Sequence, residues 1–167
     1  MAIKAKVTLK LGTLQNLTRL LSQQSVLKPI GEAVISGVLD SVSRGVSPVR
    51  GLGRFVAYSG ASDRRKYPFS VRSEYPNKKL RPVNLSLDGS MLSSIKSKIE
   101  NDKLFVGIFG GKHELMAETH NEGTQENSKN KVPKRKFLPT GRGEDFIVSI
   151  QRAIKDLFVK AIDDILK

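Results

Sequence analysis

The 167-residue sequence contains no cysteine, and this absence removes several chemistries at once. Without thiols the chain has no disulfide, no thiolate nucleophile and no thiolate metal ligand. No apolar run approaches the roughly 18 residues that a membrane-spanning helix needs. The stretch from Met1 to Leu11 is studded with lysines and lacks a separate apolar block, so we expect no secretion signal and a reducing compartment.

Acidic residues are also in short supply. The chain has 16 Asp and Glu against 29 Lys and Arg, which gives a formal net charge of +13. Such a protein attracts polyanions or acidic protein surfaces. The excess is concentrated in residues 41–83 and 128–142, both rich in Gly, Pro, Ser and Asn, so we expect the basic residues to lie mostly on loops.

The length and composition favour one domain over residues 1–167, with a real core but not two. Apolar and polar residues alternate from Ile3 to Leu11, which predicts a strand with one buried face. Apolar residues then recur at helical spacing from Leu14 to Val42, and Pro29 predicts a kink or a break in that long helix. Residues 45–82 show no sustained period and are punctuated by Gly and Pro, which predicts a basic loop insertion.

The second half of the chain predicts a hairpin and two further helices. The apolar runs Ile95–Ile99 and Leu104–Phe109 flank Asn101-Asp102, a plausible hairpin turn, and the second run should be the central strand. We then expect a short helix over 112–120 that Gly123 ends in a left-handed conformation.

The last third of the chain completes the predicted fold. Residues 122–131 predict a polar loop, and Val132–Leu138 predicts another strand. A wide apolar stripe predicts a C-terminal helix opened by Glu144 and Asp145. The fold class is therefore α+β: a small antiparallel or mixed sheet packed by a long N-terminal helix and an amphipathic C-terminal helix, with a long basic loop insertion.

Two short motifs come near to known sites without completing them. His113-Glu114 begins like the H-E-x-x-H zinc helix, but Ala117 stands where the second histidine is required. His113 and His120 are two turns apart on one helix face, near Glu114 and Glu118, and we interpret them as ordinary helix polarity. Gly107–Lys112 resembles a phosphate loop, but that pattern puts Val106 at its first glycine and His113 at its Ser or Thr position.

The adjacent acidic pairs Glu144-Asp145 and Asp163-Asp164 point about 100° apart on a helix, so they do not form a catalytic dyad. The sequence therefore supports neither an enzyme nor a cofactor or metal site.

The basic clusters Arg64-Arg65-Lys66-Tyr67 and Lys134-Arg135-Lys136-Phe137 combine cations with aromatic rings. This combination suits phosphate contacts with base stacking, but it equally suits a solvated loop or an arm that pairs with acids on another subunit. No recognition helix, zinc finger or basic zipper is visible. We therefore expect non-specific proximity to nucleic acid rather than the recognition of a DNA sequence.

Four pieces of the chain occur in an ordered series: Leu87–Leu92, Val106–Ile108, Ala117–Thr124 and Val132–Pro139. Their order and spacing resemble the virion morphogenesis family of tailed bacteriophages, which completes the tail or joins head to tail. The family pattern looks like L-x-x-T-G-x-L, a hydrophobic residue and Gly, A-x-x-H-x-x-G and (I/V)-P-x-R-x-F-L, followed by an amphipathic helix. The chain departs from it at Asp88, where Thr is common, and in the length of its basic insertion.

The resemblance implies a non-enzymatic virion protein at the neck or tail end, present in the host cytoplasm during assembly. It implies a homo-oligomeric ring, a hexamer, around the DNA conduit, with an adaptor or stopper, a tail terminator or the tail tube as neighbours. The candidate motif residues, which also suit structural roles, are His120, Glu122, Gly123, Pro133, Arg135, Phe137 and Leu138. The candidate basic residues facing a partner or DNA are Arg64, Arg65, Lys66, Lys134 and Lys136.

Within these motifs, we expect His120 and Glu122 to bond the following loop, and Phe137 and Leu138 to anchor either the core or a neighbouring subunit. Two alternatives to tail completion or head-to-tail joining remain. One is a small, non-specific nucleic-acid-binding protein that uses residues 44–81 and 129–142. The other, within the virion, is a tail terminator that caps the tube.

Overall fold

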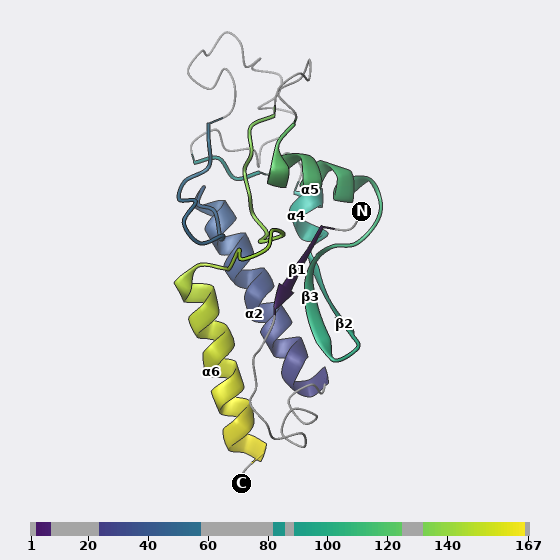
Figure 1. Ribbon diagram of the computed structural model, residues 1–167, viewed down its shortest axis with the longest axis vertical. Coiled ribbons are helices and arrows are strands. Elements are labelled where there is room, and N and C mark those ends of the chain that lie inside the picture. Colours follow the sequence, from purple (N-terminus) through teal and green to yellow (C-terminus); the bar gives the residue numbers. More distant parts are fainter. Residues whose placement is uncertain (1–2, 8–23, 58–81, 86–88, 125–131, 166–167) are drawn as a thin grey trace.

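The computed structural model describes residues 3–7, 24–57, 82–85, 89–124 and 132–165 of the chain. These residues form an α+β fold, as the sequence predicts (Figure 1). Its strands are β1 (Ile3–Val7), β2 (Lys96–Glu100) and β3 (Lys103–Ile108), and its helices are α2 (Gln24–Ser43), α4 (Ser90–Ser93), α5 (Lys112–Glu122) and α6 (Val148–Ile165).

The sheet is antiparallel, with the strand order β1-β3-β2. β3 is therefore central, as predicted, and it pairs with β1 from Ile3 opposite Ile108 onward. The predicted hairpin is present: Asn101 and Asp102 have φ values of 50° and 58°. Positive φ at both central residues matches the right-handed twist of the two strands, so this turn sets their register.

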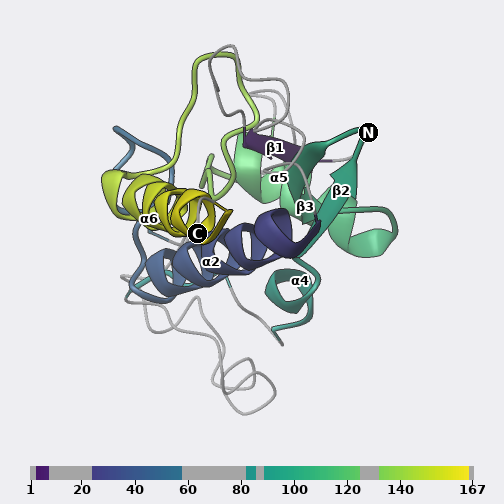
Figure 2. The ribbon, with the colours of Figure 1, turned by 90° about the horizontal axis from the view of Figure 1, so that it is seen from below.

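Helix α2 is the centre of the fold. Its buried residues recur every three or four positions and face both the β2–β3 hairpin and α6, which runs antiparallel to α2 (Figures 1 and 2). These residues are Leu27, Ile30, Gly31, Val34, Val38, Ser41 and Val42. Ile150, Ile154 and Phe158 supply the matching buried stripe of α6.

The close approach of α6 to α2 depends on Gly37. A Cβ atom at this position would lie 2.7 Å from Cγ1 of Ile150, inside the van der Waals contact distance. Glycine inside a helix costs about 0.5–1 kcal/mol relative to alanine. Here it lets the two helices pack side chain against backbone.

Three of the predicted helices and strands differ from the structure. Pro29 neither breaks nor restarts α2, which is continuous from Gln24 to Ser43, and the part of the predicted helix that precedes residue 24 lies outside the described residues. Residues 132–138 contain no strand, since their backbone groups bond to side chains and loops instead. Helix α6 begins at Val148, not at Glu144 and Asp145, because the Glu144 carboxylate binds the preceding turn and Lys136.

Residues 45–57, the first part of the expected insertion, are not a structureless loop. Val46 pairs with Arg54 in an antiparallel bridge, and Val49 pairs with Phe146 just before α6. Ser47 N also donates to Gly53 O at 2.7 Å. This part of the chain therefore forms a small turn fastened to the 132–146 segment, while residues 58–81 lie outside the described part.

Candidate functional site

The motif residues named from the sequence meet at one place, where the C-terminal end of α5 contacts the 132–146 segment (Figure 1). Arg135 N donates to His120 O at 2.7 Å. Thr124 and Val132 are joined twice, by Thr124 N to Val132 O at 3.0 Å and by Val132 N to the Thr124 hydroxyl at 2.9 Å. These bonds hold the two motif pieces, 117–124 and 132–139, side by side.

Asn121 organises this contact, although the sequence-based selection did not include it. Its side chain is fully buried, and Oδ1 accepts hydrogen bonds from both Phe137 N and Leu138 N at 2.9 Å. Its Nδ2 donates to Leu138 O at 3.1 Å and to Glu122 Oε1 at 2.9 Å. One amide group thus satisfies three backbone groups that a β-ladder would otherwise satisfy.

Gly123 ends α5 with φ 77° and ψ 177°, so it has the expected positive φ but an extended ψ. A Cβ atom here would lie 3.0 Å from Lys134 N and 3.1 Å from Val132 O. Both the backbone conformation and the close contact therefore require glycine. The turn at Gly123 directs the chain away from the helix so that it can return alongside it.

Phe137 and Leu138 are both fully buried within the hydrophobic core. Of the two roles considered for them, this position fits an anchor of the subunit's own core. Pro133 is half-buried just before them.

Lys136 lies at the centre of an ion-pair network. Its side chain is 3% exposed, and its Nζ contacts Glu122 Oε1 at 2.9 Å and Glu144 Oε1 at 2.7 Å. The prediction that Lys136 faces a partner or DNA is therefore wrong, because both carboxylates hold the ammonium group inside the fold. A buried charge is tolerated only when it is paired in this way.

The network shifts the pKa values of all three groups. Burial raises the pKa of Glu122, but hydrogen bonds from Thr140, Lys136 and Lys134 outweigh it and lower this pKa to about 2. Burial likewise opposes the charged form of Glu144, yet bonds from Lys136 and from backbone N–H groups leave its pKa lowered. The pKa of Lys136 is raised, since its two carboxylate partners outweigh the cost of burial.

Arg135 connects this cluster to residues 45–57. The residue is 2% exposed, and its Nε and Nη2 donate to Val56 O at 2.8 Å and to Ala57 O at 2.9 Å. The neighbouring Ser47 hydroxyl donates to Lys136 O. Arg135 therefore holds the turn at 45–57 in place through these hydrogen bonds.

Four basic candidate residues remain. Arg64, Arg65 and Lys66 lie outside the described residues. Lys134 is exposed and pairs with Glu122 Oε2 at 3.1 Å, so it is the one basic residue of the 134–136 cluster whose side chain is open to solvent.

No group of three or more His, Asp or Glu residues in the described ranges is placed to hold a metal ion. No helix within those ranges is long and apolar enough to cross a membrane.

Asn121, Glu144 and Ser47 also belong to the site, although they were not predicted from the sequence to be part of it. Asn121 occupies a variable position of the family pattern, and only its place in the last turn of a helix, where asparagine is a poor helix former, distinguishes it. Glu144 resembles a helix-opening acid, and Ser47 an ordinary loop residue.

Comparison with known proteins gives no further identification: no family profile, curated protein or solved structure matches the chain. The cluster formed by residues 119–124 and 132–146 holds together α5, the 132–146 segment and the turn at 45–57. Its chemistry suits a scaffold.

Proposed function

We propose that this protein is a structural protein of a tailed bacteriophage that completes the tail or joins head to tail, as a ring around the DNA conduit. The proposal rests on the resemblance of four sequence pieces to the virion morphogenesis family. The observation that supports it best is that two of these pieces, residues 117–124 and 132–139, bond directly to each other.

The motif residues have structural roles in this contact. His120 supplies a backbone acceptor, Gly123 the required turn, and Arg135, Phe137 and Leu138 the buried anchors. A motif composed of such residues specifies a shape rather than a reaction. A rigid shape that many copies can repeat is what a ring component needs.

A deletion in the phage that encodes this protein tests the proposal. Loss of the protein should leave DNA-filled heads and separate tails in electron micrographs of the lysate, and supply of the intact protein should restore joined particles. Tails of uncontrolled length would instead assign the protein to the tail terminator. Normally joined, infectious particles without the protein would refute a role in the virion neck or tail end.

A second candidate, non-specific binding to nucleic acid, is favoured by a separate observation. Arg50, Arg54 and Arg142 are exposed on the turns at 45–57 and 141–143, and the structure shows no acidic partner for their side chains among the described residues. Binding to DNA should then weaken steeply with added salt and ignore base sequence. Replacement of all three by Ser should reduce the salt dependence if they are the groups that contact phosphate.

A further inference from the structure

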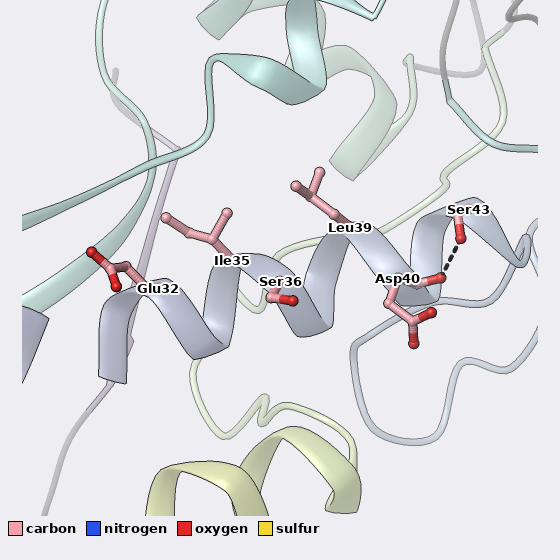
Figure 3. A pocket seen from close by; sticks show the side chains of 6 residues that line it. All are labelled: Glu32, Ile35, Ser36, Leu39, Asp40 and Ser43. Carbon is pink, nitrogen blue, oxygen red and sulfur yellow. Dashed lines mark hydrogen bonds between the residues drawn. The ribbon is translucent and has the colours of Figure 1, made fainter. Parts of the chain in front are cut away.

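One face of α2 carries an open groove of about 530 Å³. It is lined by Glu32, Ile35, Ser36, Leu39, Asp40 and Ser43. Figure 3 shows Ile35 and Leu39 projecting to the same side of the helix, between Glu32 and Asp40 along its length. The groove thus has an apolar floor with an acidic residue near each end.

The groove is acidic, although the chain as a whole is basic. The lining contains two acids and no basic residue, in a protein with a net charge of +13. Asp40 forms an ion pair with Arg44 at 2.6 Å, but both side chains are more than 60% exposed. Such an exposed pair contributes little and does not prevent another cation from approaching.

The turn at residues 50–56, which we call the arginine turn, has the complementary pattern. Arg50 and Arg54 flank Leu52, and both Leu52 and Val56 are large apolar residues that remain at least half exposed. The turn therefore presents Leu52 between two positive charges and Val56 just beyond them, whereas the groove presents Ile35 and Leu39 between two acidic residues.

The arginine turn is also held in place before any partner arrives. Arg50 N donates to Asp145 O at 2.8 Å, and Ser47 N donates to Gly53 O. Arg135 holds the carbonyls of Val56 and Ala57. A turn fixed in this way loses little conformational entropy when it binds, which favours association.

We propose that the α2 groove of one copy receives the arginine turn of a second copy. This inference rests on the proposed function, because it names the contact that would build the ring. The two surfaces are different patches of the same chain, so the contact is head-to-tail. A contact of this kind repeats from copy to copy and closes into a ring when the rotation between copies permits it.

The absence of cysteine from the chain makes a clean cross-linking test possible. Ser36→Cys places a thiol in the groove at an exposed position, and Leu52→Cys places one on the arginine turn. A mixture of the two purified single variants should form a covalent dimer with a short bis-maleimide. A variant carrying both changes should form a ladder of multimers, because each copy then has both halves of the contact.

A matched control replaces the groove thiol with Val159→Cys, an exposed apolar position on α6. The Ser36 and Leu52 pair should give about tenfold more dimer than the Val159 and Leu52 pair, the ratio that corresponds to about 1.4 kcal/mol. Equal yields from the two pairs would overturn the proposal. Efficient cross-linking of Ser36→Cys to itself would also overturn it, since the groove would then face another groove.

Exchanging the charges of the groove and of the arginine turn provides an independent test. Glu32→Arg and Arg54→Glu should each lower the cross-linking yield, and the two changes in one chain should restore it, because the attraction is re-formed with opposite signs. Asp156→Arg on the exposed face of α6 is the control and should leave the yield unchanged. A double variant no better than either single variant would overturn the proposed attraction between the groove and the arginine turn.

A negative result for the interface can be told apart from a negative result for the proposed function. Particles that assemble normally without the protein would refute the role in the virion, while the groove contact would remain measurable in the purified protein. Conversely, unjoined heads and tails in the deletion phage, combined with no specific cross-link, would retain the virion role and reject this interface.

Discussion

Removal of the Asn121 side chain should cost a large part of the stability of the protein. Asn121→Ala leaves the N–H groups of Phe137 and Leu138 without the acceptor that both use at 2.9 Å. Both residues are fully buried, so water does not replace the lost bonds. An unsatisfied buried donor costs about 1–3 kcal/mol, and two of them cost about 2–6 kcal/mol.

The assay is urea denaturation at neutral pH, with hydrogen exchange at the two amides as a local readout. A loss of this size matters, because a typical domain is stable by only about 5–15 kcal/mol. Asn121→Leu separates the hydrogen bonds from the volume, since it keeps a side chain of similar size and removes both acceptor and donor. It should lose stability to a similar degree.

Thr119→Ala on the same helix is the matched control, because its hydroxyl bonds, among the described residues, only to the helix carbonyl of Leu115 and the bond is exposed. It should change the free energy of unfolding by about 0.5 kcal/mol or less. If Asn121→Leu unfolds at the same urea concentration as the unmodified protein, the two amides do not depend on Asn121 and the reasoning is refuted.

Four other perturbations have expected outcomes. Phe137→Ala should cost about 3–5 kcal/mol in denaturation experiments, because Phe137 is a fully buried core residue. Arg135→Met should speed hydrogen exchange and proteolysis in residues 45–57, since the two backbone carbonyls that Arg135 holds lose their donors. The stability supplied by Glu122 should be complete above its unfolded pKa of 4.5 and should fall, in thermal unfolding, as the pH drops towards about 2, and Glu144, whose pKa is also lowered, should add to this loss below pH 4.5. Lys136→Met should flatten this acid dependence, because it removes the cation that lowers both pKa values.

Each of these has its own control. Leu115→Ala changes an apolar residue that is 69% exposed, so it should leave stability nearly unchanged. Arg142→Met removes an exposed arginine and should not alter exchange in the 45–57 turn. Lys134→Met removes the exposed partner of Glu122 and should alter the acid dependence less than the loss of Lys136. An unchanged acid profile after Lys136→Met would show that the network does not set the pH dependence.

Features that depend on neighbouring residues were predicted well. Asn101-Asp102 between two apolar runs indicates a hairpin because the turn needs positive φ, and both residues adopt it. The stripe of α6 and the central place of β3 follow from the period and from the apolar residues on both strand faces. These signals are local, so a single sequence contains them.

Features that depend on distant residues were not predicted. Residues 132–138 have the composition of a strand, yet the acceptor for Phe137 N lies 16 residues away on α5. Lys136 has the appearance of a surface cation, and its burial requires carboxylates from both Glu122 and Glu144. Because each outcome depends on which groups meet after folding, neither period nor composition indicates it.

The contacts of Gly45 hold together two points of the chain that are distant in sequence. Gly45 accepts a bond from Phe55 N, and a Cβ atom on Gly45 would lie 2.5 Å from Cβ of Pro82. The turn at 45–57 and the chain at residue 82 therefore lie side by side. The distance between these two points is set by the core and does not depend on the length of the chain between them, so residues inserted between 57 and 82 should leave this contact in place.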